Sequence, residues 1–405
     1  MPPVPTTVPA PSAATRGDSY LGLLGTTVLL GLGYSFVYPF LSLWGTQHIG
    51  LSPVQFSVFM TVVMGAAMIW NLTVGHLSDL RGTRRGWLLL GAASGMLGYL
   101  GYAFIEHPLA LTAIGSLVIG AAAISFPQLF AYVREWSLAR VAAGTSSRPA
   151  HITMSQVRVC FSLAWTVGPA TAAAVVARFD YRGLFLAAAA LYALFLLGIA
   201  RYVAVAPHSS TDAASTPRAS LREALLQRDL LLGFVALAFN FAAHALNLLN
   251  LPLLINGELG GSTRDLGIAL AIGPIVELPL MLWFGRCASR RGRHWLMILG
   301  LLGTVLYFAG LSLATTPWHV FLVQPFSGLS FAILTNVAIV YFQDLRPGQA
   351  GLTTSVFSNS ANAGNLLGYL SFGFAVDAFG HQGVPLITTG LGLIGLIVFL
   401  FMRRE

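Results

Sequence analysis

Two charged side chains stand well inside long apolar stretches of the sequence. Arg158 and Glu277 each lie about eight or nine residues from the nearest arginine-rich connection, which in a helix is roughly 12–14 Å. An isolated charge at that depth in a membrane costs about 3 kcal/mol or more, so each should face a wet cavity or a partner. A carboxylate in such a place could also take up a proton.

Polar side chains form stripes on two other apolar stretches, and one of these stripes holds Ser355, Asn359, Asn362 and Asn365. Asn240, His244, Asn247 and Asn250 follow one another at spacings of 4, 3 and 3, the interval of one helix face. Such a stripe either lines a polar cavity or bonds neighbouring helices together. His244 could carry a proton, although a single histidine on a polar face is more often only a hydrogen-bonding residue. Further polar or aromatic candidates on the apolar stretches are Tyr34, Tyr38, Gln128, Trp165, Asn336, Asn359 and Asn362.

One connection carries a dense set of glycines and charges, namely Gly75, Asp79, Arg81, Gly82, Arg84 and Arg85. Gly75 allows close helix approach, and the charge of Asp79 needs the arginines or an opposing helix N-terminus as partner. We expect a latch between Asp79 and the helix that begins near Gly348, holding two halves of the molecule shut. The alternative is an ordinary basic loop with a tight turn. Other charged helix ends should join this network or simply anchor at the interface: Arg134, Glu135 and Asp344.

The composition indicates that these groups lie in a membrane protein. Of 405 residues, 56% are apolar and 9% are charged, whereas a soluble domain carries about 25% charged residues. The apolar stretches run past 20 residues without the alternation of a β-barrel, so they predict helices. We expect twelve, at about 20–46, 53–76, 86–105, 109–133, 150–177, 182–203, 229–255, 264–286, 293–313, 317–342, 349–376 and 382–402.

The arginines predict the orientation. All 22 basic residues are arginine; three lie in odd-to-even connections, eighteen in even-to-odd connections and the tails, and one is Arg158. The positive-inside rule therefore places both termini in the cytoplasm. This distribution between apolar stretches argues against a nucleic-acid partner.

An internal repeat divides the chain into halves. The connection from Gly75 has a counterpart from Gly285 to Arg293, with the same spacing between its glycines but no aspartate. Duplicated six-helix units are typical of transporters. We expect a disordered cytoplasmic tail at 1–19, an N-terminal bundle at 20–203, a linker at 204–228 and a C-terminal bundle at 229–405.

The loop from Gly75 to Arg85 resembles the signature loop of the major facilitator superfamily. Further segments are similar to bacterial sugar efflux transporters: Tyr341 to Gly351, Asn250-Leu-Pro252, Glu277-Leu-Pro279, Pro127-Gln128, Arg134-Glu135, and Arg158 followed by Ser162 to Trp165 with Gly168-Pro169. The resemblance implies an all-α fold of two pseudo-symmetric six-helix bundles in the bacterial inner membrane. It also implies export of sugars or sugar-like glycosides in exchange for protons, by a chain that we expect to be monomeric and without cofactor or metal.

The resemblance also places the candidate site. In the implied fold helices 5 and 8 meet across the two halves, so Arg158 and Glu277 should lie close together, with Glu277 taking the proton. The alternative is that water or backbone satisfies each charge separately. The amides, tyrosines and Trp165 are the inventory that sugar hydroxyls and sugar rings need, so we expect them to bind substrate.

Three other functions remain open. A drug or metabolite exporter would keep this fold, although the glycines that usually flank Gly168-Pro169 in drug antiporters are replaced by alanines. A membrane-embedded enzyme would need clustered ligands or an activated nucleophile, and no such spacing stands out. A sensor would normally bring an added soluble domain.

Overall fold

The computed structural model describes residues 19–81, 84–146, 148–204, 227–287, 290–346 and 349–402. For the helical residues 79–81, 150–151, 282, 285–287, 290–291 and 350–351 it describes the backbone only. Every regular element in these ranges is a helix, as the composition predicts.

The N-terminal half forms one group of helices, which we call the N lobe. Its elements are α1 (Tyr20–Val37), η1 (Tyr38–Phe40), α2 (Leu41–Leu43), η2 (Trp44–His48), α3 (Pro53–Arg81), α4 (Arg84–Phe104), α5 (Pro108–Ala113), η3 (Ile114–Ile119), α6 (Gly120–Ala122), α7 (Ser125–Ala142) and α8 (Ala150–Tyr202). The elements from α5 to α7 form one nearly continuous rod, so the fourth span runs nine residues beyond its predicted end at 133.

The C-terminal half forms a second group, the C lobe. Its elements are α10 (Arg228–Leu253), η4 (Leu254–Glu258), α11 (Thr263–Cys287), α12 (Arg290–Ser312), α13 (Pro317–Leu334), α14 (Val337–Leu345) and α15 (Ala350–Leu400). In the described part of the chain, nine helices are long and apolar enough to cross a membrane.

Two of the helices are double spans. The helices α8 and α15 hold 53 and 51 residues, which at about 1.5 Å per residue is more than twice a hydrocarbon core of about 30 Å. Each reverses at one residue with positive φ, Asp180 (58°) and Gly380 (66°). Counted twice, and joined by α11, they complete the twelve helices that the sequence predicts.

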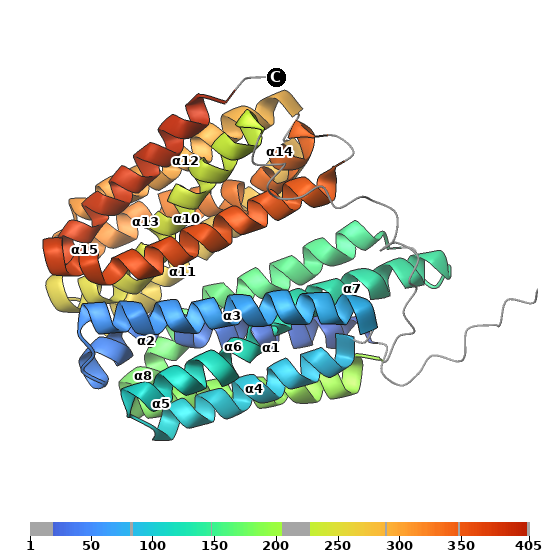
Figure 1. Cartoon of the computed structure of the whole chain (residues 1–405), viewed down its shortest axis with the longest axis horizontal. Coiled ribbons are helices and arrows are strands. Elements are labelled where there is room, and N and C mark those ends of the chain that lie inside the picture. Colours follow the sequence, from blue (N-terminus) through green and yellow to red (C-terminus); the bar gives the residue numbers. More distant parts are fainter. Residues whose placement is uncertain are drawn as a thin grey trace, which may run out of the picture.

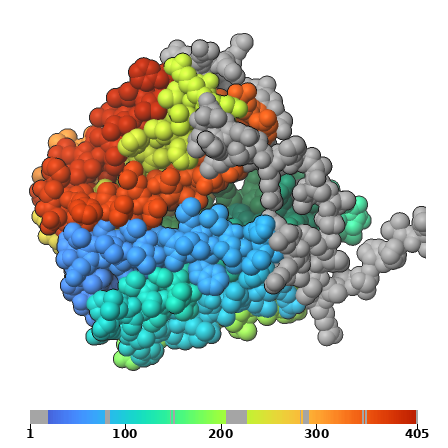
Figure 2. Space-filling model, in the orientation of Figure 1, coloured from blue at the N-terminus to red at the C-terminus, as the bar shows by residue number. Residues whose placement is uncertain are grey.

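The two lobes lie side by side and diverge toward one end (Figure 1). That end carries the even-to-odd connections, so we call it the arginine-rich end, and the opposite one the arginine-poor end. Figure 2 shows a hollow between the lobes, bordered by blue atoms of the N lobe and orange atoms of the C lobe, with green atoms behind.

Two seams hold the lobes together at the arginine-poor end. In the first, α15 lies against the start of α3: a methyl group on Gly373 would meet Val54 Cα at 2.6 Å, and the Ser57 hydroxyl donates to the Tyr369 carbonyl (2.6 Å). In the second, a methyl group on Gly267 of α11 would lie 3.2 Å from Ala170 Cα of α8. Such close backbone approach is what small residues allow between membrane helices.

The internal repeat extends to the ends of the first and seventh spans. Each ends in a π-helical turn, and two amides beyond it donate to carbonyls five and six residues earlier, at 2.8–3.0 Å. Each then turns at a glycine with positive φ, Gly50 (80°) or Gly260 (64°). The two glycines stand 210 positions apart, as do Gly75 and Gly285. The duplication is therefore built into the backbone geometry.

Candidate functional site

Arg158 joins the two lobes. It lies on α8, and its Nη2 donates to the Thr335 carbonyl, between α13 and α14, at 3.0 Å. Glu277 on α11 acts electrostatically on Arg158, but no ion pair or hydrogen bond joins the two side chains. Both are half-buried. The structure thus brings the two charges to one seam, while backbone satisfies the guanidinium.

The carbonyl that Arg158 uses is available because the tenth span is broken. The Thr335 hydroxyl donates to Phe331 O (2.7 Å), and the Asn336 amide donates to Ala332 O (3.1 Å). Side chains that bond back to helix carbonyls compete with the backbone and bend the helix. The amide of Asn336, expected to bind substrate, is therefore used in this break.

The fourth span has an irregular turn at Ala123 and Ile124, a place comparable to the break in the tenth span. Pro127 has no N–H for the Ala123 carbonyl, and the Tyr34 hydroxyl donates to that carbonyl instead, at 3.3 Å. The ring of Tyr34 stacks on that of Tyr38, with centroids 6.2 Å apart, and the Tyr38 hydroxyl contacts Met64 Sδ at 3.1 Å.

Tyr34 and Tyr38 belong to a larger cluster. Together with Tyr99 of α4 and Tyr192 of α8 they line a small cavity in the N lobe, with about 20 Å³ open to water-sized groups. Tyr34 and Tyr38 are predicted from the sequence as binding residues, whereas Tyr99 and Tyr192 are not. A turn of helix separates Gly95 from Tyr99, and this small residue beside an aromatic was the available signal.

The stripe on α10 points into the C lobe. Thr304 donates to Asn240 Oδ1 (2.7 Å), Asn247 Nδ2 donates to the Tyr307 hydroxyl (3.2 Å), and Asn250 Nδ2 donates to the His381 carbonyl (3.0 Å). His244 lies 3.4 Å from the Thr304 hydroxyl. In this conformation these groups join α10 to neighbouring helices of the same lobe, which is the alternative of helix–helix contact.

The remaining predicted binding residues are scattered. On α15, Asn359 Nδ2 donates to the Ser355 carbonyl one turn earlier (2.8 Å), and Asn362 is exposed. Trp165 on α8 is half-buried. In the described ranges, no three His, Cys, Asp or Glu side chains come together as metal ligands.

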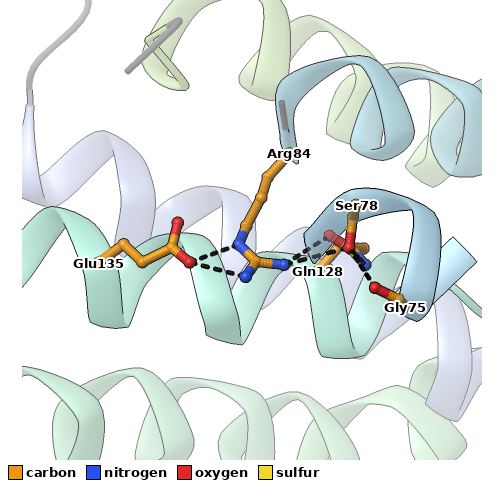
Figure 3. Close-up of polar contacts among 5 residues, drawn as sticks. All are labelled: Gly75, Ser78, Arg84, Gln128 and Glu135. Atoms are coloured by element: carbon orange, nitrogen blue, oxygen red, sulfur yellow. Dashed lines mark hydrogen bonds and ion pairs between the residues drawn. The ribbon is translucent and has the colours of Figure 1, made fainter. Parts of the chain in front are cut away.

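Arg84 organises the arginine-rich end of the N lobe (Figure 3). Its Nε and Nη2 contact Glu135 Oε1 at 2.8 and 2.7 Å, and its Nη1 donates to Gln128 Oε1 at 3.1 Å. The buried amide of Gln128 in turn donates to the Ser78 hydroxyl at 2.9 Å. Gln128, expected to bind substrate, is therefore a member of this network, which ties α3, α4 and α7 together.

The C lobe repeats this arrangement. Arg293 of α12 pairs with Asp344 of α14, and the two partners are 51 positions apart, as are Arg84 and Glu135. Both pairs stay inside one lobe, so neither bridges the lobes in this conformation. A further contact at this end also stays inside the N lobe: the Arg85 side chain donates to the Ala200 carbonyl at 3.0 Å.

The predicted latch lies outside the described residues. The structure describes no side chain at Asp79 or Arg81 and neither Gly82 nor Gly348. Gly75 has open space around it, and Arg134 is exposed. The latch stays a prediction.

Comparisons with known proteins agree with this architecture. The profile of the Major Facilitator Superfamily matches residues 23–249 and again residues 233–405. A candidate sugar efflux transporter of Deinococcus radiodurans is 29% identical over 95% of this chain and 98% of its own length. Sugar efflux transporter A of Dickeya chrysanthemi is 27% identical over 93% of each chain, and that of Escherichia coli is 26% identical over 94% of this chain and 95% of its own.

Solved transporter structures share the fold. The nucleoside transporter NupG superposes with a TM-score of 0.76 at 16% identity, over 95% of this chain and 99% of that one. A D-xylose–proton symporter gives a TM-score of 0.71 at 16% identity, over 95% and 97% of the two chains.

Proposed function

We propose that this chain exports sugars or sugar-like glycosides in exchange for protons. The chain belongs to the Major Facilitator Superfamily and is a multi-pass membrane transporter. The single observation that carries the coupling is the hydrogen bond from Arg158 to the opposite lobe, beside the carboxylate of Glu277. The substrate class is proposed because the relatives are named sugar efflux transporters.

The proposed setting is the bacterial cytoplasmic membrane. The arginine split supports cytoplasmic termini, so the hollow between the lobes opens to the cytoplasm. The seams at Gly373 and Gly267 then close the periplasmic side. This is the loading conformation of an exporter that works by alternating access as a monomer.

The coupling proceeds through the charge of Glu277. When the carboxylate is ionised, it stabilises the guanidinium of Arg158 at its place between the lobes. Protonation from the periplasm removes that stabilisation, and substrate release and proton uptake share one conformational step. Glu277 suits this role because no described group donates a hydrogen bond to it, so no such bond holds the carboxylate in its ionised form.

The lining of the N-lobe cavity supports this substrate class. Four tyrosines and apolar side chains such as Val63 and Ile119 line it, and no charged group does. Hydroxyls pair with sugar hydroxyls, and aromatic rings cover the C–H face of a sugar. A drug bound by an exporter of the same fold would contact the aromatic rings without forming hydrogen bonds to the hydroxyls.

The test is uptake into inverted membrane vesicles under an imposed pH gradient, with a panel of labelled glycosides and cationic drugs. We expect saturable glycoside uptake that a protonophore abolishes. Glu277→Gln should retain substrate exchange but lose acceleration by the gradient. Glu106→Gln, at an exposed carboxylate near the arginine-poor end, is the matched control. Uptake of drugs alone would refute the sugar assignment, and a fully coupled Glu277→Gln protein would refute the coupling.

A further inference from the structure

The tyrosine cavity of the N lobe lies close to the C lobe, because η1, which carries Tyr38, packs against α10. Its rim is formed by half-buried Tyr34, Tyr38 and Met64, and its floor by buried Tyr99 and Tyr192. A substrate held between the lobes therefore has access to the rim.

The floor of this cavity presents two hydroxyls without partners. Tyr99 and Tyr192 are 4% and 3% exposed, and neither hydroxyl forms a hydrogen bond with any described residue. These hydroxyls are not among the fully buried unpaired polar atoms, so they keep accessible surface and can pair with a group that enters the cavity. At the rim, the bonds are weak: Tyr34 donates at 3.3 Å, and Tyr38 contacts a sulfur.

The floor is also held rigidly. The ring of Tyr192 lies between two helices at their glycines: a methyl group on Gly95 would meet the ring at 2.1 Å, and one on Gly33 would meet it at 2.8 Å. These contacts fix the position of the Tyr192 ring, and with it the hydroxyl oxygen, before any ligand arrives. A preformed pair of hydroxyls can distinguish ligands by what each ligand places between them.

The space limits what can enter. About 20 Å³ is room for one water-sized group and excludes a sugar ring. No charged side chain lines the cavity, so an ammonium or carboxylate would be left unpaired. A hydroxyl, which both donates and accepts, matches the phenol groups.

We propose that this cavity is a subsite for the exocyclic hydroxymethyl group of a hexopyranoside, with Tyr99 and Tyr192 as specificity-determining residues. A ring hydroxyl projects from the ring by one bond, whereas a hydroxymethyl oxygen projects by two and reaches the floor. The proposal rests on the proposed sugar transport. It adds that the transporter distinguishes hexosides from analogues that lack this one oxygen.

The test compares three substrates in the glucoside series and three in the galactoside series, by uptake into inverted vesicles. Each series contains the methyl hexopyranoside, its 6-deoxy analogue and the pentopyranoside that lacks the hydroxymethyl group. We expect the hexoside to have a KM about tenfold lower than that of either analogue in at least one series. Tyr99→Phe and Tyr192→Phe should each raise the hexoside KM about tenfold and leave the KM of the analogues unchanged.

Tyr102→Phe is the matched control, because Tyr102 lies one turn from Tyr99 on α4, is equally buried and does not line the cavity. It should leave the preference intact. Equal transport of all three substrates, or an equal loss for all three in the tyrosine variants, would overturn the subsite while leaving sugar transport standing; the cavity would then hold only water. Uptake of no glycoside at all would instead refute the proposed function.

Discussion

Gly373 is the position where one methyl group should change the balance between conformations. In the described structure, a Cβ at this residue would lie 2.6 Å from Val54 Cα, 2.8 Å from the Pro53 carbonyl oxygen and 2.9 Å from Ser57 Cβ. Two of these neighbours are backbone atoms, which cannot rotate away. Gly373→Ala should therefore open the seam between α3 and α15.

The size of the effect follows from overpacking. Forcing an extra methyl group into a packed contact costs about 1–3 kcal/mol, which shifts a two-state equilibrium by roughly 5- to 150-fold. The strain disappears when the lobes separate at the arginine-poor end. We expect a population shift toward that separated conformation, with little change in the thermal unfolding midpoint.

Double electron–electron resonance measures the shift directly. Spin labels at Gln47 and Glu258 report the separation of the lobes, because both residues are exposed at the ends of the first and seventh spans. The native Cys160 and Cys287 are replaced by serine in this background. Gly373→Ala should increase the population at long distance in the absence of substrate.

A matched substitution separates packing from helix propensity. Gly390 lies on the same helix, α15, with open space where a Cβ would project. Gly390→Ala should leave the distance distribution unchanged. The reasoning is wrong if Gly373→Ala gives the same distribution as Gly390→Ala, because the contact would then not hold the lobes together.

Three further substitutions test other parts of the structure. Arg84→Met leaves the Gln128 acceptor unpaired, and we expect it to lower the free energy of unfolding by about 1–3 kcal/mol, measured by thermal melting in detergent. Thr304→Val removes the donor to Asn240 inside the C lobe, so it should lower the melting midpoint while the glycoside KM stays unchanged; a raised KM would instead return the α10 stripe to the binding site. Gly95→Ala drives a methyl group into the Tyr192 ring and should cost about 1–3 kcal/mol in the same melting assay, whereas an unchanged midpoint would show that the ring is free to move.

The fold could be predicted from the sequence because only helices and closed barrels satisfy backbone hydrogen bonds inside a lipid bilayer. An apolar stretch of sufficient length must be a helix, and arginine counts divide the connections by side. What the pattern could not give is where a helix continues past its apolar part. The fourth span extends to Ala142, beyond its predicted end at 133, and in this extension Glu135 pairs with Arg84.

The candidate site was predictable only in part. Their depth in apolar stretches identified Arg158 and Glu277, because a charge inside the membrane is costly unless it has a partner or faces water. The direction in which a polar face points is not encoded by its spacing, so the α10 stripe fitted a cavity and a helix contact equally well. Tyr99 and Tyr192 lie on different helices, so no spacing in the sequence relates the two, and Gly33 and Gly95 leave the room that the Tyr192 ring occupies.

The two seams differ in chemistry although the lobes repeat one another. The contacts between α3 and α15 use a serine hydroxyl and backbone, whereas the seam between α8 and α11 lies beside a guanidinium and a carboxylate. Membrane voltage does work only on charge that moves, about 2.3 kcal/mol per elementary charge at 100 mV. With Glu277 ionised, the pair has no net charge, so the membrane voltage does no net work when the pair moves. Once the carboxylate is protonated, the positive charge of Arg158 is no longer balanced. If Glu277 takes the proton as proposed, the protonated carrier is the form whose motion the electrical part of the gradient can drive.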